Sequence, residues 1–156
     1  MLKNPLNMSV DLRSSIKSEV TVSMKSGNKF RTITLRLIVS AIQSEEINIK
    51  SELKDIECLQ ILEKMIKQRK DSINQFEAAG RTELADKEKL EIQIIQEFMP
   101  EQMSEEEVSE LVLKTISDLK AESMKDMGKV MAKMKELSAG KADAGIISQA
   151  VKKALS

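Results

Sequence analysis

The chain has 156 residues, enough for one domain or two small ones, and its 41% apolar and 32% charged composition is typical of a folded soluble protein. It contains no histidine, which excludes Ser-His and Cys-His nucleophile pairs and removes the commonest metal ligand. A single cysteine, Cys58, excludes an intramolecular disulfide and any CxxC site, and three phenylalanines without Trp or Tyr argue against an aromatic platform for stacking bases. We therefore expect no catalytic residues, no cofactor and no metal.

The start of the chain carries no recognisable export or membrane signal. Residues 1–5 lack the basic and apolar regions of a secretory signal, and no stretch of roughly 18 apolar residues occurs. We therefore expect a cytoplasmic protein that is not embedded in a membrane. The alternative is an organelle matrix, because residues 9–31 are rich in serine and basic side chains, although Asp11 and Glu19 are atypical of a transit peptide. Residues 1–7 are predicted to form a flexible tail.

The first third of the chain predicts two helices. A helix is predicted over 9–26, ending at Gly27, because apolar residues recur at every fourth position: Leu12, Ile16, Val20 and Met24. In the next segment, 31–42, apolar and polar residues alternate from Ile33 to Val39, as they do in a strand. A lone strand would leave its backbone groups unpaired, and no second segment alternates in this way. We therefore predict a helix here too, with a strand as the alternative.

The middle of the chain has few residues that break helices. Apolar residues at spacings of three and four predict the longest helix over 53–79, before Gly80. A further helix follows and stops at Pro100. Its predicted apolar face comprises Leu84, Leu90, Ile94, Ile95 and Phe98. We place a domain boundary at this proline, giving an N-terminal helical domain of residues 1–99 and a C-terminal domain of residues 100–156.

A small three-helix domain is predicted over residues 104–156. Ser104 and Glu107 form a capping box, and the carboxylates of residues 105–107 favour the positive end of a helix, so we assign them no catalytic or metal-binding role. The following helix has an apolar stripe comprising Val130, Met131, Met134 and Leu137. Its opposite side is a basic ridge comprising Lys125, Lys129 and Lys133. After a break at Gly140, Asp143 is the predicted N-cap of a last short helix.

Motifs that carry catalysis are not found in the sequence. The two Gly-Lys pairs, at Gly128 and Gly140, lack the other residues of a phosphate-binding loop. Glu88 and Glu91 have the spacing of di-iron ligands, but that site also needs histidine, so we interpret them as part of a salt-bridged or solvated helix face. Cys58 lies in an apolar helical segment and is interpreted as a small buried side chain.

Charge is distributed unevenly, although the chain is neutral overall. Residues 1–50 and 123–156 each carry a net charge of +4, whereas residues 51–99 carry −3 and residues 100–122 carry −5. The basic ends either meet an anionic partner or pack against the acidic middle. Several lysines on one ridge can neutralise phosphates without reading a base sequence. The predicted RNA-binding residues are therefore Lys125, Lys129 and Lys133 and, on the longest helix, Lys64, Lys67 and Lys70.

Short motifs stand in a distinctive order along the chain: TLRLI at 34–38, MIKQRKDSI at 65–73, QFEAAGR at 75–81, LADKE at 84–88, EFMP at 97–100 and MGKVM at 127–131. Their order and separation resemble those of the YqeY-like family, from residue 8 to residue 155. That family is related to the tail of the B subunit of the tRNA-dependent amidotransferase, which converts Glu-tRNA(Gln) or Asp-tRNA(Asn) to the amidated form. The resemblance implies an all-helical N-terminal domain followed by a small helical domain similar to that tail.

The resemblance also implies a role beside tRNA. In the multisubunit enzyme the tail contacts tRNA, whereas the kinase and transamidase chemistry resides in other domains. By position, the resemblance places Gly128, Lys129 and residues 140–143 at the tRNA-facing end, with Lys141 added to the RNA-binding residues. The leading hypothesis is a non-catalytic, tRNA-binding accessory protein. One alternative is a component of a glutamine-dependent carbon–nitrogen ligase that works with partner amidotransferase subunits, and another is a helical protein-interaction module.

Overall fold

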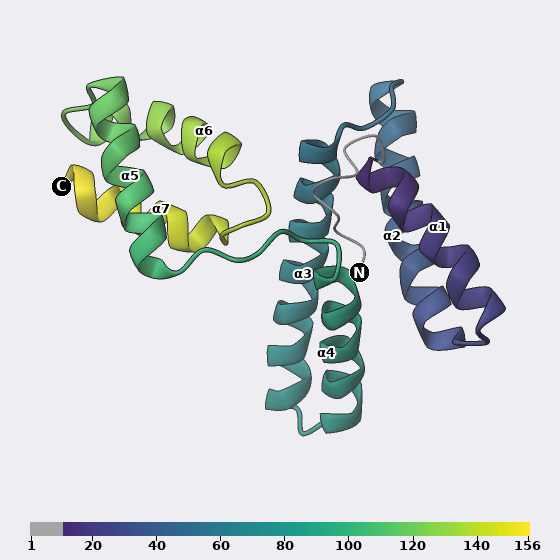
Figure 1. Cartoon of the computed structure of the whole chain (residues 1–156). Helices are drawn as coiled ribbons and strands as arrows, with labels where there is room; N and C mark the ends of the chain where they lie inside the picture. The colour runs from purple at the N-terminus through teal and green to yellow at the C-terminus, as the bar shows by residue number, and fades with distance from the viewer. Residues whose placement is uncertain (1–10) are drawn as a thin grey trace. The chain divides into compact units, whose positions relative to one another are not determined.

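The computed structural model describes residues 11–156, which contain seven α-helices, one short 3₁₀ helix and no strand (Figure 1). The predicted all-α fold is therefore confirmed. The flexible tail predicted at residues 1–7 lies outside the described residues. The chain divides after Met99 into two compact units, called here the N-terminal unit and the C-terminal unit. That each unit folds as an independent domain stays a prediction.

The described part of the N-terminal unit consists of two helical hairpins. The first pairs α1 (Leu12–Lys25) with α2 (Lys29–Ile49), and the second pairs α3 (Asp55–Ala78) with α4 (Thr82–Gln96). The Asp11 carboxylate caps α1 by accepting a hydrogen bond from the Ser14 amide at 2.7 Å. Hydrogen bonding by the Ser14 side chain, and then by its amide, lowers the pKa of Asp11. At the turn after α1, Gly27 adopts a φ of 75°, which glycine tolerates without the steric cost of a side chain.

Helix α2 includes the segment whose sequence alternates like a strand. Its buried residues, Leu35, Ile38 and Ile42, are at most 1% exposed and follow helical spacing. Ile33 and Leu37, which belong to the alternating pattern, are 59% and 43% exposed. Leu35 belongs to the same alternating pattern but is buried, so the helical period, and not the alternation, decides which side chains enter the core.

One hydrophobic core joins the two hairpins of the N-terminal unit. Each helix contributes fully buried side chains to it, including Ile16, Leu35, Ile38, Cys58, Leu62, Ile95 and Phe98. Apolar area removed from water in such a core is worth about 25 cal/mol per Å² and provides the main stabilisation of the unit. A second, smaller cluster within the α3–α4 hairpin contains Ile73, Ala85 and Ile92.

The predicted apolar face of α4 is partly wrong. Leu84 and Leu90 are 39% and 50% exposed, whereas Ala85 and Ile92 are buried against α3. The helix is rotated so that a small alanine faces its partner, which lets the two helices of the hairpin approach closely. Hydrophobicity in the sequence predicts that the leucines are buried, but close packing at the α3–α4 contact buries the smaller alanine instead.

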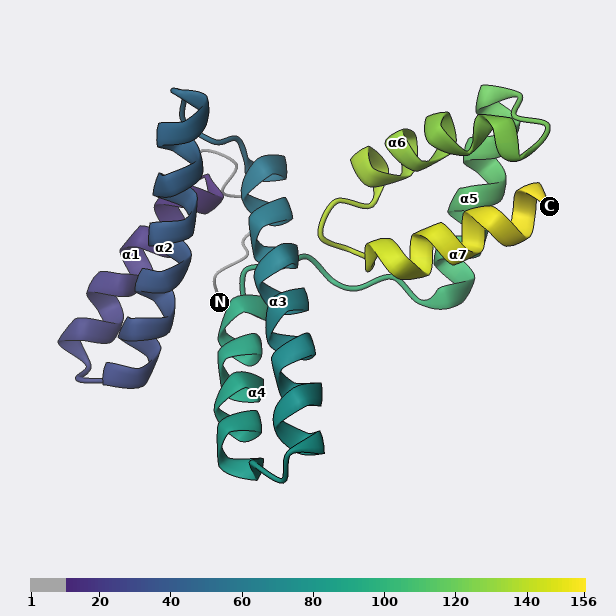
Figure 2. The ribbon, with the colours of Figure 1, turned by 180° about the vertical axis from the view of Figure 1, so that it is seen from behind.

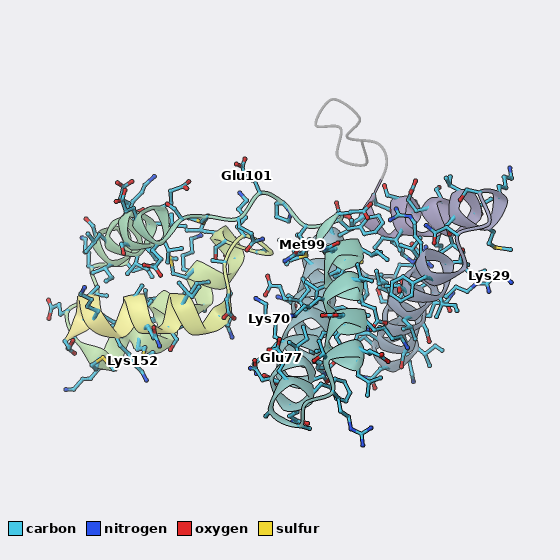
Figure 3. All side chains as sticks on the ribbon, turned by 90° about the horizontal axis from the view of Figure 1, so that it is seen from below. Lys29, Lys70, Glu77, Met99, Glu101 and Lys152 are labelled. Atoms are coloured by element: carbon cyan, nitrogen blue, oxygen red, sulfur yellow. The ribbon has the colours of Figure 1, made fainter. Side chains whose placement is uncertain are left out.

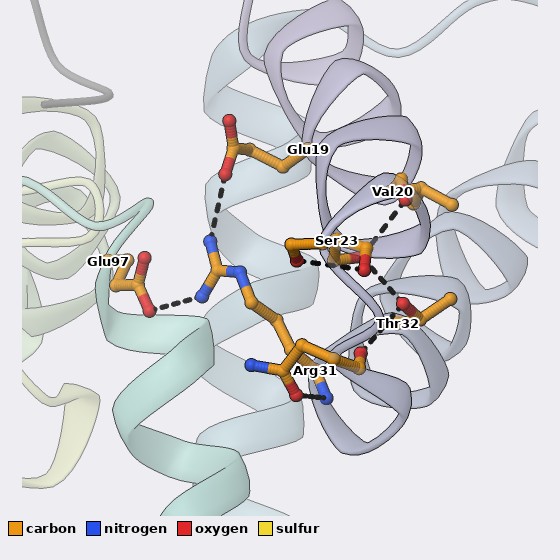
Figure 4. Close-up of polar contacts among 8 residues, drawn as sticks. Glu19, Val20, Ser23, Arg31, Thr32 and Glu97 are labelled. Carbon is orange, nitrogen blue, oxygen red and sulfur yellow. Dashed lines mark hydrogen bonds and ion pairs between the residues drawn. The ribbon is translucent and has the colours of Figure 1, made fainter.

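Two arginines of the α1–α2 hairpin form ion pairs between helices. The guanidinium of Arg31 on α2 donates to Glu19 of α1 at 3.0 Å and to Glu97, the residue after α4, at 2.6 Å (Figure 4). Arg13 on α1 donates to Glu46 of α2 at 2.6 Å, and the same carboxylate accepts the Leu53 amide at 3.0 Å. Both guanidinium groups therefore serve the fold.

The C-terminal unit is a three-helix bundle, as predicted. It comprises α5 (Glu105–Leu119), the 3₁₀ helix η1 (Met124–Asp126), α6 (Met127–Leu137) and α7 (Ala144–Leu155). Both bonds of the predicted capping box form at α5, between Ser104 and Glu107, each at 3.1 Å. The core is built from all three helices and includes Val108, Val112, Val130, Met134, Ile147, Val151 and Leu155. Leu137, predicted in the apolar stripe, is 42% exposed because α6 ends there.

The loop between α6 and α7 is held against the segment that precedes α5. The Met103 amide donates to the Lys141 carbonyl at 2.8 Å, and the Gln102 side chain donates to the Gly140 carbonyl at 2.7 Å. Asp143 caps α7 as predicted, although its bond to the Gly145 amide is long, at 3.4 Å. These contacts place the α6–α7 loop at the same end of the bundle as the start of α5 (Figure 2).

Candidate nucleic-acid interface

The predicted basic ridge of the C-terminal unit is less regular than the sequence suggests. Lys129 and Lys133 lie one turn apart on α6, as expected, but Lys125 lies in η1, before α6 begins. Lys129 approaches Asp126 at 3.9 Å and Lys133 approaches Glu136 at 3.7 Å, which are long contacts at the protein surface. Such pairs are worth little, so they leave both lysines available to a stronger anion.

The structure separates the residues that the resemblance implies at one tRNA-facing end. Gly128 and Lys129 lie in the first turn of α6, whereas residues 140–143 follow its last turn. The eight α6 residues 130–137 lie between Lys129 and the loop, which corresponds to about 12 Å. Gly128 and Lys129 therefore occupy one end of the three-helix bundle and Lys141 the other, and a single cluster at one end is corrected to two separate positions.

One end of the bundle gathers lysines from four elements, and we call it the basic end. Here α5 ends, η1 and α6 begin, and α7 ends, because α6 and α7 run antiparallel (Figures 1 and 2). The basic end comprises Lys120, Lys125, Lys129, Lys152 and Lys153. All five are exposed, and Figure 3 shows Lys152 extending from α7. The carboxylates at this end are Asp118, Glu122 and Asp126.

One of these carboxylates is already engaged by the backbone. Asp126 accepts the Glu122 amide at 2.9 Å, a bond that lowers the pKa of Asp126 and stabilises the turn before α6. In contrast, no carboxylate among residues 11–156 lies within ion-pairing distance of Lys120, Lys125, Lys152 or Lys153. The lysines of the basic end therefore exceed the carboxylates that compete for them.

The opposite end of the bundle has the reverse charge. It carries the acidic first turn of α5, residues 105–107, and the capping residue Asp143, with Lys141 beside them in the α6–α7 loop. An anion approaching Lys141 also meets these four carboxylates, whose repulsion offsets the attraction of the lysine. Lys141 is exposed, but its surroundings make it the weakest of the predicted phosphate contacts in this unit.

The other predicted lysines belong to the N-terminal unit. Lys64, Lys67 and Lys70 are all exposed on α3, and Figure 3 shows Lys70 extending from the helix. Lys67 contacts Asp71 at 3.4 Å, and both side chains are largely solvated. Successive positions three apart drift around a helix by about 60°, so these lysines spread over a broad face instead of forming one row.

Sequence reasoning missed Lys152 and Lys153. They follow the apolar pattern of α7 at its last turn and have no motif that marks them. Two signals were available: cations near a helix C-terminus complement its dipole, and a six-residue loop between α6 and α7 makes these helices antiparallel. Combining the two places both lysines beside the start of α6.

Cys58 and the Glu88–Glu91 pair, whose side chains are of types that can carry catalysis or bind metal, have structural surroundings. Burial raises the pKa of the Cys58 thiol to about 11, so this buried cysteine is not a nucleophile at neutral pH. Glu88 and Glu91 both face Arg69, each with a carboxylate oxygen 3.8 Å from its Nε atom, as expected for a salt-bridged face. Burial raises the pKa of Glu91, and its neighbour Glu88 raises it further. The three side chains join α3 to α4.

Residues 11–156 contain neither a cluster of metal ligands nor a helix suited to a membrane. No group of three or more acidic or cysteine side chains there is arranged to hold a metal ion. None of the helices in this range combines the length and the apolar character needed to cross a bilayer.

Comparison with known proteins then identifies the family. The sequence matches the family described as Yqey-like protein over residues 13–155, nearly the whole chain. The chain belongs to the YqeY family. A YqeY-like match over both units confirms the resemblance found from the sequence motifs.

Fungal relatives support the assignment. An uncharacterized protein of Schizosaccharomyces pombe is 37% identical over 94 residues, which are 60% of this chain and 76% of that protein. "Altered inheritance of mitochondria protein 41, mitochondrial" of Clavispora lusitaniae is 32% identical over 70% of this chain and 65% of its own length. The Kluyveromyces lactis protein of the same name is 32% identical over 71% of this chain and 62% of its own length. The chain thus matches less than two thirds of these two mitochondrial proteins.

Proposed function

We propose that this YqeY-family protein is a non-catalytic accessory protein that binds tRNA through the basic end of its C-terminal unit. The observation that carries the proposal is the convergence of five exposed lysines from α5, η1, α6 and α7 at one end of the bundle. Four of the five have no carboxylate partner among residues 11–156. The choice of tRNA among RNAs rests on the relation of the family to the amidotransferase tail.

The type of side chain indicates how the RNA is held. Lysine ammonium groups bind phosphates as point charges, without the planar bidentate geometry of arginine. The C-terminal unit offers no Phe, Tyr or Trp on which an unpaired base could stack. We therefore expect binding to the sugar–phosphate backbone, with strong salt dependence and little base specificity.

The location of this activity is part of the proposal. Two of the relatives are named as mitochondrial proteins, which supports the organelle matrix over the cytoplasm for this chain. Fractionation of cells of the source organism, with antibody detection, tests this directly. Recovery in the cytosolic fraction alone would assign the protein to the cytoplasm.

The test of RNA binding compares two matched double variants. Lys125→Glu with Lys152→Glu reverses two unpaired lysines at the basic end, and Lys135→Glu with Lys141→Glu reverses two unpaired lysines toward the opposite end. Both variants change the net charge equally within the same unit. Fluorescence anisotropy with labelled tRNA at fixed salt is expected to show a loss of affinity of about tenfold or more for the first and less than about threefold for the second.

Equal losses in the two variants would show that net charge, and not the basic end, governs binding. Absence of tRNA binding by the wild-type protein at low salt would reject the function itself. Because all four lysines are exposed, both variants are expected to unfold at the wild-type temperature, and circular dichroism checks this.

A further inference from the structure

A shallow groove runs between α1 and α2 on the N-terminal unit. Lys17 and Val20 line it from α1, and Arg36, Val39, Ser40 and Gln43 line it from α2. The two valines are half-buried and form its floor, whereas Arg36, Ser40 and Gln43 are exposed along the rim. The groove thus combines an apolar floor with polar walls.

The cations of the groove are not used by the fold. Arg13 and Arg31, in the same hairpin, are both neutralised by carboxylates at 2.6 Å. No such partner exists among residues 11–156 for Lys17 or Arg36, one on each wall. Within residues 11–156, the one hydrogen bond of the Arg36 guanidinium is to the Met24 sulfur, at 3.2 Å, and a thioether is a weak acceptor.

The apolar surface continues beyond the floor. Met24 lies one turn after Val20 on α1 and is 54% exposed, and Ile47 lies one turn after Gln43 on α2 and is 78% exposed. No carboxylate lines the groove. An occupant that complements this surface has an apolar stripe to cover the valines and Met24, with negative charges on both sides of the stripe.

We propose that the groove between α1 and α2 docks an acidic amphipathic helix of a partner protein. Helix-in-groove recognition places one apolar face in the groove and leaves flanking side chains to pair along its walls. Carboxylates beside the apolar stripe then meet Lys17 and Arg36, while Ser40 and Gln43 can hydrogen-bond at the rim. RNA fits less well, because an apolar floor gives no stabilisation to phosphates and the lining contains no aromatic ring for a base.

The partner segment can be found by site-specific crosslinking in the full-length protein. A photoreactive amino acid at Ser40 or Gln43 reports on the groove, and the same residue at Gln93, exposed on α4, is the control. Crosslinked peptides are sequenced from cells. The proposal predicts a partner segment with apolar residues at helical spacing and Asp or Glu on both flanks, captured at the groove positions and not at the control.

Binding of a synthetic peptide with that partner sequence then tests the role of the groove. Lys17→Glu with Arg36→Glu is expected to weaken peptide binding by at least about tenfold. Lys25→Glu with Lys29→Glu changes two exposed cations of the same hairpin outside the groove and is expected to change it by less than about threefold. Thermal unfolding verifies that both variants are folded.

Several outcomes would overturn the proposal. In the crosslinking experiment, these are crosslinks to nucleic acid, to residues 1–10 of the chain itself or to a segment without acidic amphipathic character, and labelling no stronger than at Gln93. In the peptide-binding experiment, the contradicting outcome is an equal effect of the two double variants. The peptide-binding comparison contains no tRNA and changes no lysine of the basic end, so this proposal and the proposed function fail separately.

Discussion

Two regions of the molecule have the same net charge and use it differently. Residues 1–50 and 123–156 each carry +4 in the sequence. In the first, Arg13 and Arg31 are about one-fifth exposed and bind carboxylates that join α1, α2 and the end of α4. In the second, the cations are all lysines, and the two that approach a carboxylate do so at 3.9 and 3.7 Å, to a residue three positions away. In both regions most cations have no ion pair among the described residues.

The difference shows why net charge alone does not locate a binding surface. Arginine has a planar group with several donors and can satisfy two carboxylates at once, as Arg31 does with Glu19 and Glu97. Lysine is strongly hydrated and stays in solvent unless a partner approaches. The positive charge available to an anion is therefore that of the unpaired side chains.

The largest expected effect is on the bridging arginine. Arg31→Gln is predicted to lower the free energy of unfolding by about 2 kcal/mol, because it leaves Glu19 and Glu97 without their common partner. Arg36→Gln, which removes an exposed arginine without an ion pair among the described residues, is predicted to cost less than about 0.5 kcal/mol. Urea denaturation measures both. Equal effects of the two substitutions would contradict the distinction between arginines whose ion pairs stabilise the fold and cations that remain free to bind an anion.

A second prediction concerns the pH dependence of two carboxylates. The Leu53 amide and then Arg13 hold the pKa of Glu46 below its usual value of 4.5, so its contribution to stability is present above that value and is lost as the pH falls through the lowered pKa. Burial raises the pKa of Glu91, so its dependence on pH has the opposite sign. Its contribution to stability is present at low pH and is lost as the pH rises through the raised pKa.

Glutamine substitutions separate these signs. The cost of Glu46→Gln, measured by urea denaturation, is predicted to be greatest at pH 7 and to diminish below pH 4.5, as the wild-type carboxylate is protonated through its lowered pKa. Glu91→Gln is predicted to be most favourable relative to wild type at pH 7 and to lose that advantage as the pH falls. Parallel pH profiles for the two variants would refute the assigned contacts.

The smallest effect concerns Lys120, at the end of α5. Its φ of 54° lies in the left-handed region, which costs a side chain roughly 1 kcal/mol, and glycine avoids this at a smaller entropic cost. Lys120→Gly is predicted to stabilise the protein by about 0.5 kcal/mol and to weaken tRNA binding slightly. Lys120→Ala retains the strain and serves as the control in calorimetry. A gain in stability in both variants would show that backbone strain at this position is not the cause.

Much of the local structure follows from sequence pattern alone. The capping box at Ser104, the break at Gly27 and the burial of Cys58 depend on residues close in the chain, and all three were predictable. The exposure of Leu84 and the burial of Ala85 depend on how α4 packs against α3, which no local pattern determines. Hydrophobicity identifies an amphipathic helix but leaves its rotation uncertain by a residue.

The candidate site shows the same division. Lys129 and Lys133 share a face because they are one helical turn apart, which the sequence shows. The grouping of Lys125 with Lys152 and Lys153 depends on the antiparallel arrangement of α6 and α7, and the separation of Lys141 from Lys129 depends on where α6 ends. Tertiary arrangement therefore decides which of the lysines can act together.

The salt dependence of tRNA binding tests the central distinction most directly. Lys125, Lys152 and Lys153 replaced together by Gln should reduce the slope of log affinity against log salt concentration by about 2, because each lost phosphate contact contributes about 0.7 to 0.9. Arg13→Gln, measured under conditions where the protein stays folded, should leave the slope unchanged. An unchanged slope in the lysine variant, or an equal reduction in the arginine variant, would contradict the account.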